Sequence, residues 1–229
     1  MNESAFLRAL HLNDGLLPTG GFAYSDGLES AVSHGGMRDA GDLGGWMRHY
    51  VDAILPACDG PALLGAASAC ANEDWTRLAA LDQELTAIKP AAAVRAGSRV
   101  IGRRLLATWS GAYPSSSLAA FAEQVERGGL AGNLQVVYGA VCASAGIGER
   151  EMVLGFGYGR LAGTASAALR VMPIGQQAVQ RLLSDCLADL PAQAAGVVAR
   201  GACPLRSFSP RLDIEQMTHG YVYSKMFRS

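Results

Sequence analysis

Two glycines near the N-terminus, Gly15 and Gly20, have the spacing of a phosphate-binding P-loop. In that motif a lysine and then a serine or threonine follow the second glycine, and the lysine provides the positive charge that holds the phosphates. Here Gly21 and Phe22 occupy those positions, and no strand is evident before the loop. We therefore expect no nucleotide to bind at this segment.

Ser25 lies in the sequence AYSDG, which resembles the nucleophile elbow G-x-S-x-G of serine hydrolases with its first glycine replaced. An elbow needs a strand before the serine, and an acid and then a histidine later in the chain. No strand is predicted before Ser25. The favoured interpretation is a cap on the helix that begins near Leu28, with a serine hydrolase as the alternative.

A third pattern, Gly157-Tyr-Gly159-Arg-Leu-Ala162, matches the dinucleotide fingerprint G-x-G-x-x-A. The fingerprint requires a strand–helix–strand unit and an acidic residue about 20 positions later. The nearest acid, Asp185, lies beyond a proline break. Glycines that let two helices cross closely are the favoured interpretation. A small helical NAD(P)-binding oxidoreductase that uses Gly157–Ala162 is the alternative function.

The histidines and cysteines do not form a recognisable metal site. His11, His34, His49 and His219 are scattered, without an H-x-x-x-H pair. The cysteines are odd in number and widely spaced, without a C-x-x-C pair, and are typical of reduced thiols. We therefore expect no metal or cofactor to bind directly, and we expect a protein that is not an enzyme.

One polar cluster has helical spacing. Arg95, Ser98, Arg99, Gly102 and Arg103 would share roughly one face of a helix, because residues three and four apart are neighbours on its surface. The glycine would let another backbone or side chain approach. A solvated basic face and an arginine-lined contact surface are both consistent with this pattern.

The segment Leu16–Glu29, LLPTGGFAYSDGLE, interrupts a sequence that otherwise predicts helix after helix. Glycine and proline break helices and permit unusual backbone angles. Because Phe22 and Tyr24 lie among them, the segment is predicted to be a shaped loop whose apolar groups pack on something. We expect a dimer or partner contact near the C-terminal tail, with packing on the core of the chain as the alternative.

The elements that must position these residues are predicted to be helices throughout. Apolar residues recur with the 3.6-residue period, and no repeat, linker or shift in composition marks a domain boundary. We therefore predict an all-α fold, one domain of about ten helices over residues 1–229. The candidate caps are Asp42, Asp59, Asp74, Ser117, Asn133 and Asp213, and the candidate breaks are Pro56, Pro90 and Pro191. The predicted helices cover about 4–12, 28–33, 43–55, 60–71, 75–88, 91–109, 118–127, 134–145, 149–171, 174–190, 191–200 and 214–223.

Composition indicates a protein that works in contact with others. Half of the 229 residues are hydrophobic and only 17% are charged, whereas about a quarter is usual. Such a chain is expected to bury surface against other subunits. The formal net charge of −1 gives no indication of a nucleic-acid partner. No membrane span or export signal is evident, so we expect a cytoplasmic location without membrane association.

Taken in order, four segments resemble the family of urease accessory proteins called UreF. The loop LLPTGGFAYSDGLE is similar to the family's signature loop, and Arg95–Leu106 is similar to its R-x-x-S-x-x-x-G-R-x-L-L. Pro173-Ile-Gly-Gln resembles its P-x-G-Q segment, and Ser209–Ser229 resembles its C-terminal motif. The chain departs from the family pattern where it has Asn133, Gly220 and Lys225-Met226.

The resemblance implies an all-α accessory protein that forms a homodimer and is not a catalyst. It implies partners in UreD (also called UreH), the nickel-carrying GTPase UreG, and apo-urease. In this family the complex delivers nickel to the urease active site as GTP drives a rearrangement, and the UreF subunit is proposed to modulate GTP hydrolysis. Nickel and GTP would then be handled by the partner GTPase.

The resemblance also assigns a candidate partner or dimer interface. It comprises the loop, the arginine-bearing helix face and the C-terminal segment, in which residues 224–229 are predicted to be a partner-dependent tail with few tertiary anchors. The interface residues are Pro18, Thr19, Gly20, Gly21, Phe22, Tyr24, Ser25, Gly27, Glu29, Arg95, Ser98, Gly102, Arg103, His219, Tyr223, Lys225, Phe227, Arg228 and Ser229.

Overall fold

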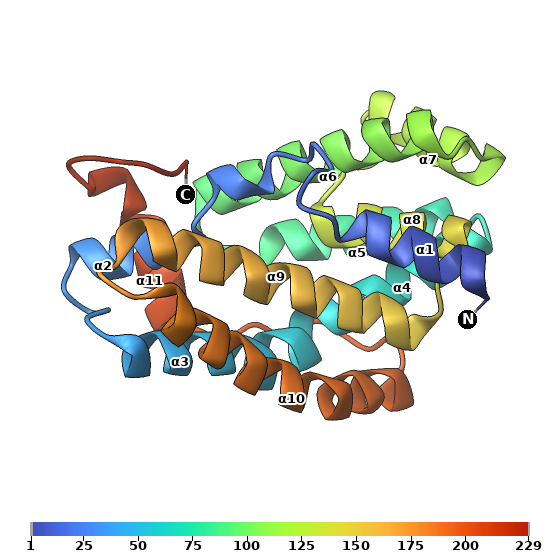
Figure 1. Ribbon diagram of the computed structural model, residues 1–229. Helices are drawn as coiled ribbons and strands as arrows, with labels where there is room; N and C mark the ends of the chain where they lie inside the picture. Colours follow the sequence, from blue (N-terminus) through green and yellow to red (C-terminus); the bar gives the residue numbers. More distant parts are fainter. Residues whose placement is uncertain (1, 229) are drawn as a thin grey trace.

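A computed structural model describes residues 2–228, and this part of the chain is all α-helical (Figure 1). The prediction of a single all-α domain is confirmed. The α-helices are α1 (Glu3–Leu12), α2 (Leu28–Ser33), α3 (Ala40–His49), α4 (Gly60–Ala71), α5 (Trp75–Ala87), α6 (Ala92–Ala112), α7 (Ser116–Glu126), α8 (Leu134–Ala145), α9 (Glu149–Val171), α10 (Gln176–Arg200) and α11 (Pro210–Thr218). A π-helix, η2 (Tyr50–Asp59), and two 3₁₀ turns, η1 (Gly21–Ala23) and η3 (His219–Tyr221), complete the secondary structure of this part.

The core is centred on α4 and α8, which pack against each other, with α6 on the other side of α8 and α9 alongside α10 (Figure 1). Both central helices are buried along most of their length. A helix that is apolar all round belongs in a core. A methyl group at Gly139 would collide with α4, so this glycine permits the close crossing of the two helices.

The segment Ala40–Ala71 is one continuous helix, and the predicted break at Pro56 is wrong. Proline in an α-helix lacks an N–H and clashes with the carbonyl four residues earlier. Here the wider π turn of η2 shifts the register of the hydrogen bonds around Pro56. The first cap is Asp39 rather than Asp42, and the predicted cap Asp59 has helical angles in the middle of the segment.

Helix α10 is also continuous through a proline, Pro191, so the two separate helices predicted there are wrong. Other caps fall close to the predicted ones. Asp74 caps α5 as predicted, whereas Ser115 rather than Ser117 caps α7. Helix α11 begins after Ser209 rather than at Asp213.

Two helical stretches, Ala40–Ala71 and Gln176–Arg200, are long and apolar enough to cross a membrane by length and composition alone. Core helices pass the same test, and 67% of the apolar window of the first stretch is buried inside the fold. For the second stretch that share is 28%, although α10 packs along α9. Length and composition are therefore weak indications of a membrane span here.

Candidate functional site

The loop 16–29 and the C-terminal tail lie side by side (Figure 1). The Arg228 backbone N–H donates to the Ala23 carbonyl oxygen over 2.9 Å. Gly20 and Gly27 have φ angles of 77° and 87°, which favour glycine. Gly27 also lies against Gln216 of α11, where a side chain would crowd the backbone. The glycine-shaped loop lies near the tail, as predicted, and its contact with a dimer or other partner stays a prediction.

Glu29, in the first turn of α2, fixes the tail to the fold. Its buried carboxylate accepts hydrogen bonds from His219 Nε2 over 2.8 Å and from the backbone N–H groups of Met226 and Phe227 over 2.6 and 3.2 Å. The Phe227 side chain is only 4% exposed. The expectation that the tail has few tertiary anchors is therefore wrong for the part that the structure describes.

Arg170, near the end of α9, joins the loop to the tail. Its guanidinium lies 4.2 Å from the centroid of the Phe227 ring, within the range of a cation–π contact. Its Nη1 also donates to the Phe22 carbonyl oxygen over 2.9 Å. One side chain therefore holds two segments that are far apart in the sequence.

The inner face of α11 is held by polar contacts. The Glu215 carboxylate accepts a hydrogen bond from His34 Nδ1 over 2.8 Å, and Gln216 Nε2 donates to Asp26 Oδ1 over 3.0 Å. His49 Nε2 and Ser209 Oγ lie 2.8 Å apart just before the helix. Together with the Glu29–His219 pair, these contacts make a polar seam between the C-terminal segment and the loop, α2 and α3.

The outer face of the same segment is apolar and exposed. Ile214 and Met217 of α11 are 58% and 56% exposed, and Tyr221 and Tyr223 follow with almost complete exposure. This arrangement is the reverse of an ordinary surface helix, whose apolar stripe faces the core.

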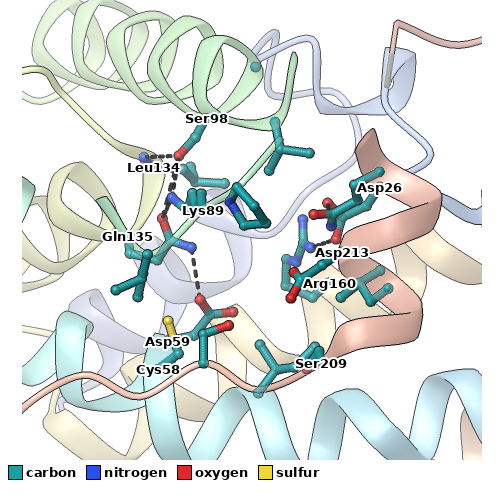
Figure 2. Close-up of a pocket in the computed structure, with 18 of the residues that line it drawn as sticks. Asp26, Cys58, Asp59, Lys89, Ser98, Leu134, Gln135, Arg160, Ser209 and Asp213 are labelled. Atoms are coloured by element: carbon teal, nitrogen blue, oxygen red, sulfur yellow. Dashed lines mark hydrogen bonds and ion pairs between the residues drawn. The ribbon is translucent and has the colours of Figure 1, made fainter. Parts of the chain in front are cut away.

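Behind the loop, a cavity of about 110 Å³ contains a cluster of charged side chains (Figure 2). Figure 2 shows Lys89 between Ser98 and Gln135, with Asp26 and Arg160 facing each other on the α11 side. Lys89 precedes α6 and Arg160 lies in the middle of α9, so the cluster joins elements from across the chain.

The Lys89 ammonium donates to three neutral oxygens: Ser98 Oγ over 3.1 Å, Gln135 Oε1 over 3.2 Å and Asn133 Oδ1 over 3.3 Å. Burial lowers the pKa of Lys89, and the negative charge of Asp59 opposes this change. The ammonium therefore links α6 to the start of α8.

Two carboxylates, the buried Asp59 and the half-buried Asp26, balance the cations of the cavity. Asp59 accepts from Gln135 Nε2 over 2.8 Å, and burial raises the pKa of Asp59 against the opposing charge of Arg160. Asp26 forms an ion pair with Arg160 and raises the pKa of that guanidinium. The charged side chains of the cavity are thus paired with groups of the chain itself.

The side chains of this cavity are poorly suited to nucleophilic or metal-dependent chemistry. Burial raises the pKa of the Cys58 thiol to about 12, so the thiol stays protonated at neutral pH and is a poor nucleophile. Across residues 2–228, no group of three or more His, Cys, Asp or Glu side chains is placed to hold a metal ion. The arrangement is suited to holding helices in register.

The arginine-bearing face of α6 contacts the chain itself at its central residues. Ser98 Oγ accepts from the Leu134 N–H over 3.1 Å and so caps α8. A methyl group at Gly102 would collide with the Gly132 carbonyl oxygen. The predicted cap Asn133 instead directs its side-chain amide to the buried Asp82 carboxylate over 2.6 Å.

The other two sequence patterns also have structural roles. Gly157 lies inside α9, where a methyl group would collide with Leu190 of α10. Because a fingerprint glycine must stand at a turn between strand and helix, the dinucleotide interpretation is wrong. Ser25 Oγ accepts from the Glu29 N–H over 3.4 Å, consistent with a role at the start of α2.

The predicted interface residues divide by exposure, and whether any of them contacts a partner stays a prediction. The exposed ones are Pro18, Phe22, Arg103, Tyr223, Lys225 and Arg228. The half-buried ones are Thr19, Gly20, Gly21, Tyr24, Arg95 and Ser98. The buried ones, whose contacts here are within the chain, are Ser25, Gly27, Glu29, Gly102, His219 and Phe227. Ser229 lies outside the described residues.

The sequence patterns do not single out several residues of the site. Arg160 and Arg170 were available as charged residues within the apolar stretch Glu149–Val171, which is a signal for a buried or interface role. The sequence around Asp59 indicates only a helix cap, and Lys89 stands out only as the residue before Pro90.

Comparison with known proteins bears on this site. A protein-family model for UreF matches residues 37–187. A protein named urease accessory protein UreF from Pseudomonas putida (strain F1) is 34% identical over 100% of this chain and 99% of its own length. Proteins of the same name from Paenarthrobacter aurescens (strain TC1) and Methylorubrum populi (strain BJ001) are 32% and 33% identical, over 100% and 93% of both chains. The full-length relatives thus include the loop and the tail, which lie outside the family-model match.

Proposed function

Because the chain belongs to the UreF family of urease accessory proteins, we propose that it is a scaffold for the maturation of urease. With UreD/UreH it recruits the nickel-carrying GTPase UreG to apo-urease, and it modulates GTP hydrolysis so that nickel enters the urease active site. Nickel is the cargo of this assembly. In this proposal the chain itself binds no cofactor and catalyses no reaction.

The observation that carries the proposal is the reversed α11 segment. Its polar seam faces the fold, whereas Ile214, Met217, Tyr221 and Tyr223 face outward. Exposed apolar patches mark interaction sites, and tyrosine is frequent among the residues that dominate binding energy. A partner subunit that covers this face would bury it.

The remaining parts of the proposal follow from the family and the composition. We propose that the chain acts in the cytoplasm and as a homodimer. Low charge and high apolar content suit a subunit that works inside a larger complex.

Co-purification tests the proposal. The tagged full-length chain is co-expressed with the cognate UreD/UreH and UreG, and the retained proteins are quantified. Tyr223→Ala should reduce retention without lowering the melting temperature, because Tyr223 is fully exposed. Tyr158→Ala removes a partly exposed tyrosine on α9 and is the matched control. If neither protein is retained by the wild-type chain, the scaffold proposal fails.

A further inference from the structure

A second cavity, of about 420 Å³, lies between α3, α9 and the start of α11. Helix α3 contributes one face, on which Gly41 and Gly45 stand beside the Trp46 ring without side chains of their own. A Cβ atom added at Gly45 would have no other atom within 4 Å, so the wall is open there. Pockets that bind small organic molecules have volumes of about 300–1,000 Å³, and this cavity is large enough to be one.

The walls of this cavity are largely apolar and partly aromatic. Trp46 of α3 and Tyr50 of η2 are four positions apart, so their rings are neighbours along one helical face. Met47, Ile54 and Leu212 add aliphatic surface. Two neighbouring rings beside glycine positions make a smooth wall, which suits the flat body of an aromatic molecule.

One end of the cavity carries positive charge with unused donors. The Arg160 guanidinium has five N–H donors, and within the described part of the chain its side chain donates only to Asp26. Helix α11 begins with Pro210 and has no side-chain cap, so the N–H groups of Arg211 and Leu212 lack intrahelical acceptors. The positive end of the helix dipole lies at the same place.

The Tyr50 hydroxyl is a further unused donor in the wall. Tyr50 is 8% exposed, and its Oη has no hydrogen-bond partner among the residues that the structure describes. Burial, and then the charge of Asp59, raise the pKa of Tyr50, so the hydroxyl stays neutral and can donate. Because buried polar groups are normally hydrogen-bonded, this hydroxyl indicates an acceptor from outside the chain.

The acids of the cavity limit the charge of a ligand. Asp26 is bound by Arg160 and Gln216, and Asp42 by Arg38. Their negative charges disfavour a dianion such as a phosphate monoester, whereas a single carboxylate needs only the unused donors. A metal ion is also disfavoured, since the described part of the chain has no group of three or more His, Cys, Asp or Glu side chains placed to hold one.

We propose that this cavity is a binding site for a small aromatic carboxylate. The ring of the ligand lies against Trp46, and its carboxylate accepts hydrogen bonds from the Tyr50 hydroxyl, the Arg160 guanidinium and the first N–H groups of α11. Such a ligand joins α11 to α3 and α9. The site adds a ligand-binding function that does not depend on the role of the chain as a scaffold.

Isothermal titration calorimetry of the full-length chain tests the site, with 2-naphthoate as the probe and naphthalene-2-carboxamide as its neutral isostere. 2-Naphthoate should bind saturably with a dissociation constant below about 1 mM, which is modest for a molecule of its size. The carboxamide should bind at least roughly tenfold more weakly, because hydrogen bonds to an ionised acceptor are the stronger ones. Saturating 2-naphthoate should also raise the melting temperature.

Three variants locate the site. Gly45→Leu fills the cavity from an open position and should weaken binding of 2-naphthoate at least roughly tenfold. Gly163→Leu, at an exposed glycine of α9 that also has open space around it and does not line the cavity, is the matched control and should bind like the wild type. Tyr50→Phe removes only the hydroxyl and should weaken binding about tenfold. Hydrogen exchange at the Arg211 and Leu212 amides should slow when 2-naphthoate is bound.

Four results would overturn the inference. The first is the absence of saturable binding of 2-naphthoate at about 10 mM, and the second is equal affinity for the carboxamide, which would show that the site does not recognise an anion. Unchanged binding in a folded Gly45→Leu variant would place the ligand elsewhere. Inorganic phosphate that binds more tightly than 2-naphthoate would assign the site to another oxyanion. If Gly45→Leu does not fold, Tyr50→Phe and the exchange of the α11 amides decide, and no change in either would contradict the site.

Discussion

Glu29 joins three parts of the chain through one buried carboxylate. It belongs to α2, and it accepts from His219 after α11 and from two backbone N–H groups of the tail. A buried charge is tolerated only where it is paired and hydrogen-bonded. The same contacts that satisfy Glu29 therefore determine where the tail lies.

Glu29→Ala should lower the free energy of unfolding by about 3 kcal/mol, because it leaves the buried His219 and two tail N–H groups without their acceptor. Hydrogen exchange at the Met226 and Phe227 amides should also become faster. Glu126→Ala, at an exposed position at the end of α7, is the control. Equal stability of the two variants in urea would show that Glu29 does not anchor the tail.

Alanine substitutions at two glycines of α6, one in close contact and one in open space, test how tightly this helix packs. Gly102→Ala should destabilise the fold by about 1–3 kcal/mol, because the added methyl group meets the Gly132 backbone. Gly111→Ala should stabilise it by about 0.5–1 kcal/mol, since nothing lies near that position and alanine favours a helix. Denaturant unfolding measures both changes. A tolerated Gly102→Ala would contradict the close contact between α6 and the loop before α8.

The pH dependence of stability should report the buried Asp59. Burial raises the pKa of Asp59 in the folded state, so the folded chain holds that proton to a higher pH than the unfolded chain does. Stability is therefore lost as the pH rises from about 4, the ordinary pKa of aspartic acid, through the raised value. Asp59→Asn cannot ionise, so its stability relative to the wild type should increase across that window and then level off. A difference that is constant from pH 4 to pH 8 in urea titrations would contradict this account.

At the scale of elements, the tail is a packed part of the fold. Removing residues 224–229 deletes the Phe227 ring, which Arg170 covers. It also removes the two backbone N–H groups, of Met226 and Phe227, that donate to the Glu29 carboxylate. The melting temperature should fall by several degrees, as expected when about 2–3 kcal/mol is lost from a domain of this size. Tyr223→Ala should leave the melting temperature unchanged. An unaltered melting temperature for the truncated chain would mean that the tail does not stabilise the fold.

Most elements could be predicted from hydrophobic periodicity, and the errors cluster at prolines. Helices α2, α8 and α9 begin and end where the sequence predicts them. Pro56 and Pro191 were predicted to end helices, because proline weakens a helix locally. Packing against neighbouring helices overrides that local preference. A pattern within one segment carries no information about such packing.

At the scale of the whole molecule, the candidate site depends on contacts between residues that are far apart in the chain. Glu29 and Phe227 are separated by 198 positions, and Arg170 and Phe22 by 148. Local patterns located the loop and the tail, and their proximity was expected. The contacts of Glu29 with the tail and the charged cavity could not be predicted, because each requires groups from several parts of the chain to converge.

The assembly in which the chain is proposed to act follows from its family and its exposed surface together. The fold encloses its own charges around Lys89, Asp59 and Arg160. It exposes Phe22 on the loop, Ile214 and Met217 on α11, and Tyr221 and Tyr223 after that helix. Such a distribution suits a protein that positions other proteins.

The most direct measurement is the activity and nickel content of urease in cells that lack this chain and are grown at low nickel. We expect urease to be made but to contain little nickel and to be inactive, and the wild-type gene should restore both properties. Fully active, nickel-loaded urease in cells without the chain would contradict its role as a maturation scaffold.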